Sequence, residues 1–139
     1  MKVMFDASAL VKRYLLERGR DAVQAQLANA TQVAVAAHCK AEIVAAFARN
    51  LHDAAMSADE VQRLLGLVQT DFADFTRIEL DGKVEALTLQ ALLRHRLRAM
   101  DALHLASAQQ AGVDLFITAD PRQAEAARAS GLNTELIEA

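Results

Sequence analysis

Short apolar runs alternate along this chain with longer stretches in which apolar residues recur at helical spacing. A short apolar run bounded by polar residues is typical of a buried strand, and such runs occupy residues 2–5, 33–36 and 115–118. Residues 76–80 alternate between polar and apolar, and the run at 134–137 is short, so both predict edge strands. The pattern therefore predicts about five short strands.

Amphipathic stretches between these strands predict helices. The clearest begins at Ser57, because Ser57 and Glu60 have the spacing of a capping box. It continues with apolar residues at positions 61, 64, 65, 68 and 72, which form one buried stripe. A first helix that carries apolar residues at 10–15 is predicted to end near Gly19. Further helices are predicted around residues 22–30, 44–51, 82–91, 101–110 and 124–128.

The alternation of short strands with amphipathic helices predicts an α/β fold. Its centre is expected to be a mostly parallel sheet with helices on both faces. No repeat, low-complexity tract or linker divides the sequence, so residues 1–139 are expected to form a single domain. In such sheets, ligands bind outside the carboxyl ends of the strands. Functional side chains are therefore expected just after strands.

Composition narrows the class of protein. The single cysteine, Cys39, cannot form a disulfide within the chain. Only three apolar residues separate Lys2 from Asp6, too few for a secretory signal, and no run approaches the ~18 apolar residues that span a bilayer. These features predict a cytoplasmic protein with no membrane partner. A net charge of −3 gives no overall basic field, so nucleic-acid contacts would depend on local clusters such as Lys12–Arg13 and residues 94–98.

Four acids are expected at one edge of the predicted sheet. Asp6 follows the first strand, Glu42 lies about one turn into the helix after the second, and Asp120 follows the strand at 115–118. Asp101 opens a helix in an apolar stretch, where a carboxylate needs a partner, a capping role or a metal. Capping explains each Asp taken singly, because Asp is a preferred N-cap residue. Glu42 lies past the cap position, so capping explains it less well.

Taken together, the acids favour a metal site. Carboxylates at one edge repel one another by about 1 kcal/mol per pair at 4 Å in water, and by more near protein. No predicted strand end carries a Lys or Arg that would neutralise them. Oxygen ligands without His or Cys pairs suit Mg²⁺ or Mn²⁺ rather than zinc. Ser8 and Thr118 add accessory hydroxyls at the same edge.

The histidines give weaker signals. His104 lies three residues after Asp101, on nearly the same helix face, but a lone His in an apolar helix is more typical of a structural residue. His38, His52 and His95 have no partners at informative spacing. We therefore expect the acids, rather than the histidines, to form the site.

In their order along the chain, four segments resemble the PIN-domain ribonucleases, and among these the VapC-type toxins of toxin–antitoxin pairs. The segments are Asp6–Lys12, Ala41–Glu42, Leu97–Ala106 and Phe116–Asp120. The similarity covers essentially the whole chain, and its most specific part is the run from Asp101 to His104. The resemblance implies a divalent-metal-dependent endoribonuclease that hydrolyses RNA phosphodiester bonds.

The resemblance also implies roles for individual residues and partners. Asp6, Glu42, Asp101 and Asp120 match the catalytic acids that bind Mg²⁺ or Mn²⁺, and Thr118 matches a frequent accessory hydroxyl. The segment around Asp120 departs from the commoner form, which has an aromatic residue before the Asp and a basic residue after it. A homodimer and an inhibiting antitoxin, whose tail enters the active-site groove, are also implied. The residues predicted to contact RNA are Lys12, Arg13 and Arg98.

Other classes share the predicted α/β outline. A haloacid-dehalogenase-like phosphatase would have a second Asp at the position of Ser8 and a Lys at the acidic edge. A receiver-type signalling module would have a Lys after a late strand, and neither Lys is present. A catalytically silent PIN-like binding module is the alternative that the sequence leaves open.

Overall fold

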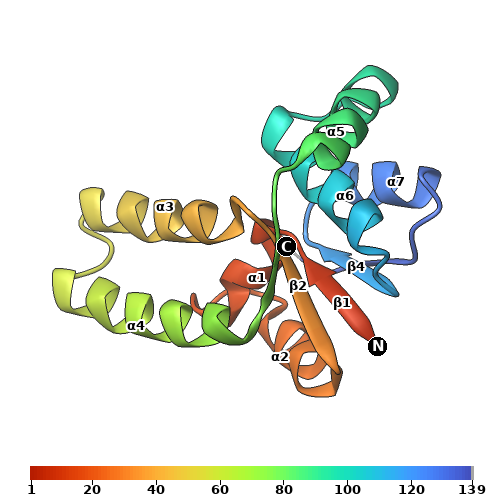
Figure 1. Cartoon of the computed structure of the whole chain (residues 1–139). Coiled ribbons are helices and arrows are strands. Elements are labelled where there is room, and N and C mark those ends of the chain that lie inside the picture. The colour runs from red at the N-terminus through yellow and green to blue at the C-terminus, as the bar shows by residue number, and fades with distance from the viewer. Residues whose placement is uncertain (139) are drawn as a thin grey trace.

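The computed structural model describes residues 1–138 of the chain. Its centre is a five-stranded sheet in the order β3-β2-β1-β4-β5 (Figure 1), and each neighbouring pair is parallel. The strands are β1 (Lys2–Phe5), β2 (Gln32–Ala36), β3 (Thr76–Ile78), β4 (Leu115–Thr118) and β5 (Thr134–Leu136). As predicted, β3 and β5 form the edges.

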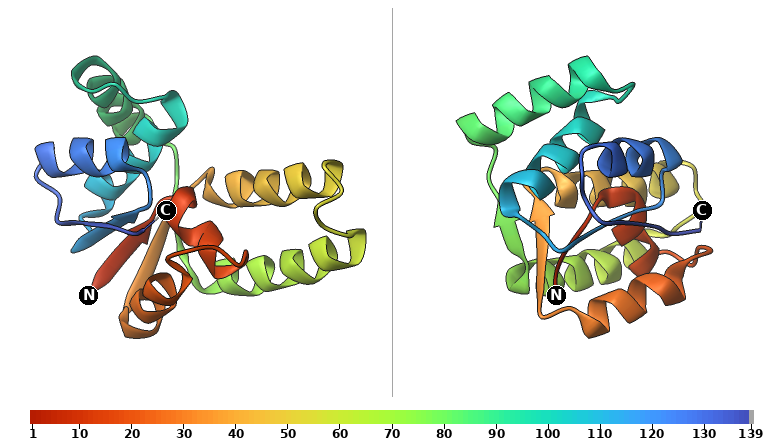
Figure 2. Two further views of the ribbon diagram at one scale, coloured as in Figure 1. Left: turned by 180° about the vertical axis from the view of Figure 1, so that it is seen from behind. Right: turned by 90° about the vertical axis from the view of Figure 1, so that its right-hand side faces the viewer.

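Two layers of helices cover the two faces of the sheet (Figures 1 and 2). One layer contains α1 (Ala7–Leu10), the 3₁₀ turn η1 (Val11–Arg13), α2 (Arg20–Asn29), α3 (Cys39–His52) and α4 (Ala58–Asp74). The other contains α5 (Gly82–Arg94), α6 (Ala99–Ala111) and α7 (Pro121–Ala129). The predicted α/β fold class is confirmed. Within residues 1–138, no helix combines the length and the apolar character needed to cross a lipid bilayer.

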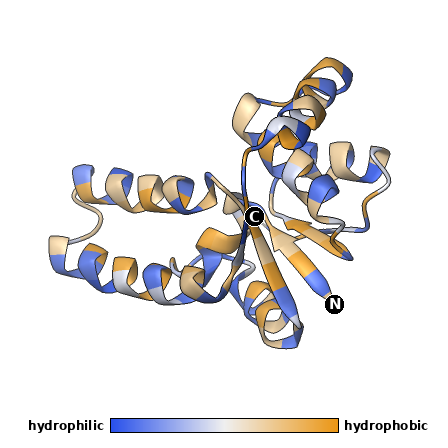
Figure 3. Ribbon diagram, viewed as in Figure 1, coloured by the Kyte–Doolittle hydropathy of each residue, from blue (hydrophilic) through white to orange (hydrophobic). Residues whose placement is uncertain are grey.

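The pleat of each strand sends successive side chains into opposite helical layers. In β1, Val3 and Phe5 join the core beneath α1 to α4, whereas Met4 joins the core beneath α5 to α7. In β4, Ile117 and Phe116 divide between the two cores in the same way. Burial of each such side chain contributes about 1.5–3 kcal/mol. Figure 3 shows the strands as mostly hydrophobic, with hydrophilic N-terminal ends on β1 and β2.

Local sequence explains several helix ends. The Ser57 hydroxyl accepts from the Glu60 amide at 3.2 Å, and the Glu60 carboxylate accepts from the Ser57 amide at 3.4 Å, which confirms the predicted capping box of α4. Asp81 caps α5 by accepting from the Val84 amide at 2.9 Å. Gly112 ends α6 in the left-handed conformation.

The first helix differs from its prediction. A helix reaching nearly to Gly19 was expected, but α1 spans 4 residues and passes directly into η1. Beyond it, Lys12 is buried and pairs with Glu17 at 3.5 Å, and the Tyr14 hydroxyl donates to Asp71 of α4 at 2.7 Å. The local Lys12–Glu17 pair and the tertiary contact between Tyr14 and α4 outweigh the helical spacing of the apolar residues. Gly19 instead precedes α2, with a φ of 94° that favours glycine.

The order of the strands defines where a ligand is expected. From β1, the sheet extends through β2 and β3 on one side and through β4 and β5 on the other. In open parallel sheets, ligands bind at such a reversal, outside the carboxyl ends of the strands. Asp6 directly follows β1, and Asp120 lies two residues after the end of β4. The topology therefore brings the first and last predicted acids to one place.

Candidate active site

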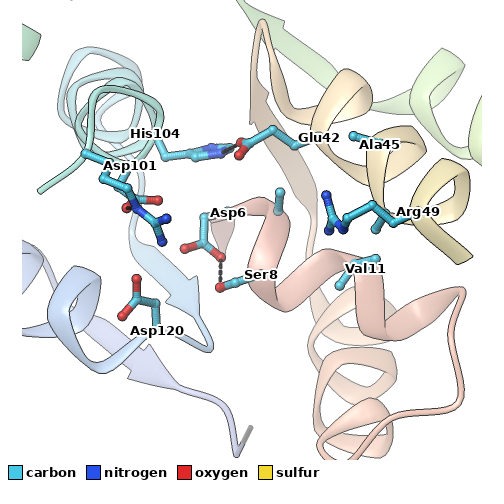
Figure 4. A pocket seen from close by; sticks show the side chains of 12 residues that line it. Asp6, Ser8, Val11, Glu42, Ala45, Arg49, Asp101, His104 and Asp120 are labelled. Carbon is cyan, nitrogen blue, oxygen red and sulfur yellow. Dashed lines mark hydrogen bonds and ion pairs between the residues drawn. The ribbon is translucent and has the colours of Figure 1, made fainter. Parts of the chain in front are cut away.

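A cavity of about 400 Å³ opens at the carboxyl edge of the sheet (Figure 4). All four predicted acids line it, although they come from the end of β1, from α3, from α6 and from the start of α7. They are Asp6, Glu42, Asp101 and Asp120. Ser8 also lines the cavity, whereas Thr118 is fully buried next to Asp6.

Asp6 is the most buried of these acids, with 2% of its surface exposed. Its Oδ1 accepts from the Ser8 hydroxyl at 2.7 Å and from the Ala9 amide at 3.1 Å, and its Oδ2 accepts from the Thr118 hydroxyl at 2.5 Å. Burial raises the pKa of Asp6, and the nearby His104 and these hydrogen bonds oppose the rise without cancelling it. A cation in the cavity would therefore stabilise the charged form of Asp6.

The two accessory hydroxyls connect Asp6 to the turn between β4 and α7. The Ala119 amide donates to Ser8 Oγ at 2.9 Å, and the Asp120 amide donates to Thr118 Oγ1 at 3.1 Å. Ser8 and Thr118 therefore position the acid after β1 against the acid after β4.

Asp101 is not a helix cap. Helix α6 begins at Ala99, two residues before the predicted start, and Arg98 occupies the N-cap position. Within residues 1–138, the polar partner of the Asp101 carboxylate is the exposed Arg98 guanidinium, at 3.8 Å. Burial raises the pKa of Asp101, and the negative charge of Asp120 adds to the rise. Of the three explanations for this acid, capping is thus removed and pairing is weak.

Asp120, in contrast, caps its helix. Its Oδ1 accepts from the Arg122 amide at 2.9 Å, and Pro121 opens α7. Figure 4 shows the Asp120 carboxylate directed toward the cavity. The fully buried Gln123 donates from Nε2 to the backbone carbonyl of Asp101 at 2.8 Å, which connects α7 to the first turn of α6.

Two histidines with weak sequence signals contact Glu42. His104 Nε2 lies 2.5 Å from Glu42 Oε1, and His38 Nε2 lies 3.2 Å from the same oxygen. Burial by itself would raise the pKa of Glu42, but hydrogen bonds from His104 and His38 outweigh it and lower the pKa to about 2. The expectation that His38 lacks an informative partner was wrong. Its spacing of four residues from Glu42 was the available signal.

Positively charged side chains reach the cavity from helices rather than from strand ends. Arg49 lies on α3, two turns after Glu42, and lines the cavity beside Ala45 and Ala46. Figure 4 shows its side chain extended toward the cavity. Arg98 lines the cavity from the start of α6. Arg49 was missed from the sequence, although its spacing of seven residues from Glu42 places both on one helix face.

Two predicted RNA contacts lie elsewhere. Lys12 is 4% exposed and pairs with Glu17, so its ammonium group is not presented to a ligand at the surface. Arg13 donates to both carboxylate oxygens of Asp71, at 2.6 and 3.1 Å. Neither residue belongs to the cavity lining, and both form ion pairs within the chain. Of the predicted RNA contacts, Arg98 alone lines the cavity.

The donor set suits a hard divalent cation. The cavity offers carboxylate oxygens from four residues, which are the ligands that Mg²⁺ and Mn²⁺ prefer. Burial raises the pKa of Asp6 and of Asp101, so a cation in the cavity would stabilise the charged forms of both carboxylates. The residues therefore fit a metal-dependent site.

Comparison with known proteins identifies the family. Residues 3–129 match the family model described as the PIN domain. The chain belongs to the PIN-domain family. Over 132 residues it is 33% identical to Ribonuclease VapC46 of Mycobacterium tuberculosis, a match that covers 94% of this chain and 93% of the relative. The VapC46 match confirms the predicted resemblance to VapC-type PIN proteins.

Solved structures share the fold at lower sequence identity. The sarcin–ricin-loop-cleaving toxin VapC20 of Mycobacterium tuberculosis superposes with a TM-score of 0.69 at 14% identity, covering 94% of this chain and 95% of that chain. VapBC2 of Rickettsia felis, bound to a DNA fragment from its promoter, superposes with a TM-score of 0.70 at 12% identity, covering 97% and 98%. At these identities the two structures support the fold of this PIN domain.

Proposed function

We propose that this PIN domain is a Mg²⁺- or Mn²⁺-dependent endoribonuclease, the toxin of a toxin–antitoxin pair. The observation that supports this most directly is the cavity that four acids from separate elements line at the carboxyl edge of the sheet. Burial raises the pKa of Asp6 and of Asp101, and a cation at that edge would stabilise their charged forms, which supports a metal site there. The relative VapC46 is a ribonuclease, which supports RNA as the substrate.

In this proposal, Asp6, Asp101, Asp120 and Glu42 hold the cation. When bound, a divalent ion lowers the pKa of a coordinated water and offsets the charge of the attacked phosphate. Ser8 and Thr118 keep Asp6 in place for that task. A pKa of about 2 makes Glu42 a weak base, so we assign it to binding and orienting rather than to proton abstraction.

The two arginines at the cavity are suited to the phosphates of the substrate. The side chain of Arg98 is 87% exposed, and Arg49 is exposed with no ion pair among residues 1–138. Contacts of this kind position the RNA backbone without reading its sequence. We propose that Arg49 and Arg98 hold RNA on opposite sides of the acids.

The proposed partners follow from the family. The relative from Rickettsia felis is a VapBC assembly, which supports an antitoxin partner for this chain. Leu89 and Leu93 on α5, with 55% and 89% of their surface exposed, are available to an antitoxin or to a second copy. The homodimer and the cytoplasmic location stay predictions.

The test is cleavage of a structured RNA by the purified chain. We expect cleavage with Mg²⁺ or Mn²⁺, none with a chelator, and a loss of at least 100-fold in Asp6→Asn and Asp101→Asn. Asp59→Asn is the matched control, because this exposed acid in the first turn of α4 makes the same change outside the cavity. It should cleave RNA at the wild-type rate.

Two outcomes would contradict the proposal. Cleavage that persists with chelator, or in both cavity variants, would show that these acids and a metal do not carry the reaction. A folded wild-type chain that binds RNA but never cleaves it would instead support the catalytically silent binding module.

A further inference from the structure

A second group of donor atoms adjoins the aspartates. His38 directly precedes α3, Glu42 lies in the first turn of α3, and His104 lies on α6. One ligand atom from each of the three lies within 4.8 Å of the other two. In the part of the chain that the structure describes, no other three such side chains approach one another this closely.

The surrounding structure holds this group in place. His104 is 1% exposed, and Figure 4 shows its ring and the Glu42 carboxylate directed toward each other. The His38 and His104 rings lie 4.1 Å apart between centroids. His38 Nε2 also lies 2.9 Å from the Met100 carbonyl, in the first turn of α6, and a cation on Nε2 would replace this hydrogen bond. The group therefore connects α3 and α6, which pack on opposite faces of the sheet.

His104 has no second hydrogen bond that would fix which of its ring nitrogens carries the proton. Its Nδ1 is buried with no hydrogen-bond partner in residues 1–138. A proton on Nε2 is donated to Glu42, whereas a proton on Nδ1 leaves the Nε2 lone pair free for a cation. The same ring can thus serve a hydrogen-bonded state and a metal-bound state. In the metal-bound state the buried Nδ1–H has no acceptor among residues 1–138, so the binding of the cation must also offset that cost.

Two imidazole nitrogens and a carboxylate oxygen are a different donor set from the aspartates. Zinc is bound by such sets at about 2.0–2.2 Å per ligand, and an open fourth position is taken by water. Ligands around a tetrahedral ion at that distance are about 3.3 Å apart. The Glu42 to His38 separation of 3.2 Å already fits, and the Glu42 to His104 separation of 2.5 Å needs to open by less than an ångström.

We propose that His38, Glu42 and His104 form a binding site for a borderline divalent cation such as Zn²⁺, which overlaps the carboxylate site for Mg²⁺ or Mn²⁺ at one residue. Glu42 belongs to both sites, so a Zn²⁺ ion held by the histidines withdraws Glu42 from the aspartates. The inhibition of cleavage by Zn²⁺ rests on the proposed nuclease function, whereas the binding of Zn²⁺ does not. The physical basis is ligand softness, because imidazole favours zinc and all-oxygen sets favour magnesium.

Binding is measured first, without RNA. The full chain is titrated with Zn²⁺ against a chromophoric chelator in buffer free of Mg²⁺ and Mn²⁺, and Co²⁺ is used as a spectroscopic substitute. We expect one Zn²⁺ per chain and a tetrahedral Co²⁺ absorption. Affinity should fall at least tenfold in His38→Gln and in His104→Gln. It should be unchanged in His52→Gln, an exposed histidine on the same helix α3.

A second variant separates this site from the aspartates. Asp6→Asn should bind Zn²⁺ as tightly as the wild type, even though it is expected to lose cleavage. Because His38 is only half-buried, His38→Gln keeps the test valid if His104→Gln does not fold. Absence of Zn²⁺ binding would overturn the proposal. Unchanged Zn²⁺ binding in folded His38→Gln, or loss of binding in Asp6→Asn, would overturn it as well.

Inhibition is measured second. In millimolar Mg²⁺ or Mn²⁺, micromolar Zn²⁺ should reduce RNA cleavage by the wild type at least tenfold. The inhibiting Zn²⁺ concentration should rise at least tenfold in His38→Gln, relative to that variant's own rate without Zn²⁺. Equal inhibition of both proteins would overturn the shared use of Glu42. If no protein cleaves RNA, the nuclease proposal fails and the binding titration still decides the zinc site.

Discussion

Replacing Asp6 with Asn should stabilise the metal-free protein while removing its response to divalent ions. Asp6 is 2% exposed and its pKa is raised by burial, so ionising it costs folding free energy. An amide is neutral at every pH and similar in shape. The Oδ1 of the new Asn side chain can still accept from the Ser8 hydroxyl and the Ala9 amide. The Nδ2 of the Asn can donate to Thr118 Oγ1 if the Thr118 hydroxyl proton turns toward the Ser8 oxygen, which lies 3.3 Å away.

The magnitude follows from proton linkage. A carboxyl group with a raised folded-state pKa contributes its full stability below its unfolded pKa of 3.8, and that stability is lost as pH rises through the folded pKa. Within this window, wild-type stability should fall by about 1.4 kcal/mol per pH unit through Asp6 alone. Asp6→Asn lacks this slope. Its advantage over the wild type should therefore be smallest near pH 4 and grow toward pH 7.

The assay is urea unfolding of both proteins from pH 4 to pH 8, in chelator and again in Mg²⁺. At a Mg²⁺ concentration 100 times its Kd, the wild type should gain about 2.7 kcal/mol. Asp6→Asn should gain much less, because it lacks the most buried ligand. The difference in free energy of unfolding between the two proteins removes the contribution of the acids that both proteins contain.

The control is Asp81→Asn, which changes an exposed N-cap of α5 in the same way. Asn and Asp are nearly equivalent caps, so its stability should stay within about 0.5 kcal/mol of the wild type. The reasoning would be refuted if Asp6→Asn were less stable than the wild type at pH 7 in chelator. In that case Asp6, which is the N-cap residue of α1 and accepts from the Ala9 amide, would act mainly as a cap, and its charge would be well compensated.

Three further perturbations test other parts of the structure. Gly19→Ala should lower the free energy of unfolding in urea by about 1–3 kcal/mol, because φ is 94° and an added Cβ would lie 2.5 Å from the Glu138 carbonyl. An unchanged urea midpoint would contradict this geometry. Asp71→Ala should lower the free energy of unfolding by about 1–3 kcal/mol, because the Arg13 and Tyr14 donors lose their acceptor. The kcat of the folded enzyme should stay near the wild-type value, and a selective loss of kcat would show a catalytic role for Asp71. Arg49→Ala should raise KM for RNA several-fold and reduce its salt dependence with little change in kcat, and a fall in kcat alone would argue against a phosphate contact.

The identity of the elements was largely determined by the sequence. In β1, Val3 and Phe5 face one side of the sheet and Met4 faces the other. This division follows directly from the sequence, because the side-chain period of a strand is two. The capping box at Ser57 and Glu60 is also local and was predictable. The placement of acids after strands predicted their common edge, because parallel strands end on the same side of a sheet.

The environment of each acid was decided by tertiary structure. The sequence allowed Asp101 to be a helix cap. In the structure α6 begins at Ala99, so Asp101 lies inside the first turn and does not occupy the N-cap position. Glu42 acquires its low pKa from His104, a residue 62 positions away that α6 brings to α3. Lys12 looked like an RNA ligand by its charge, and packing buried it against Glu17. Periodicity and capping act over a few residues and can be read locally, whereas burial and charge pairing depend on which helices meet, and that is settled only when the whole chain has folded.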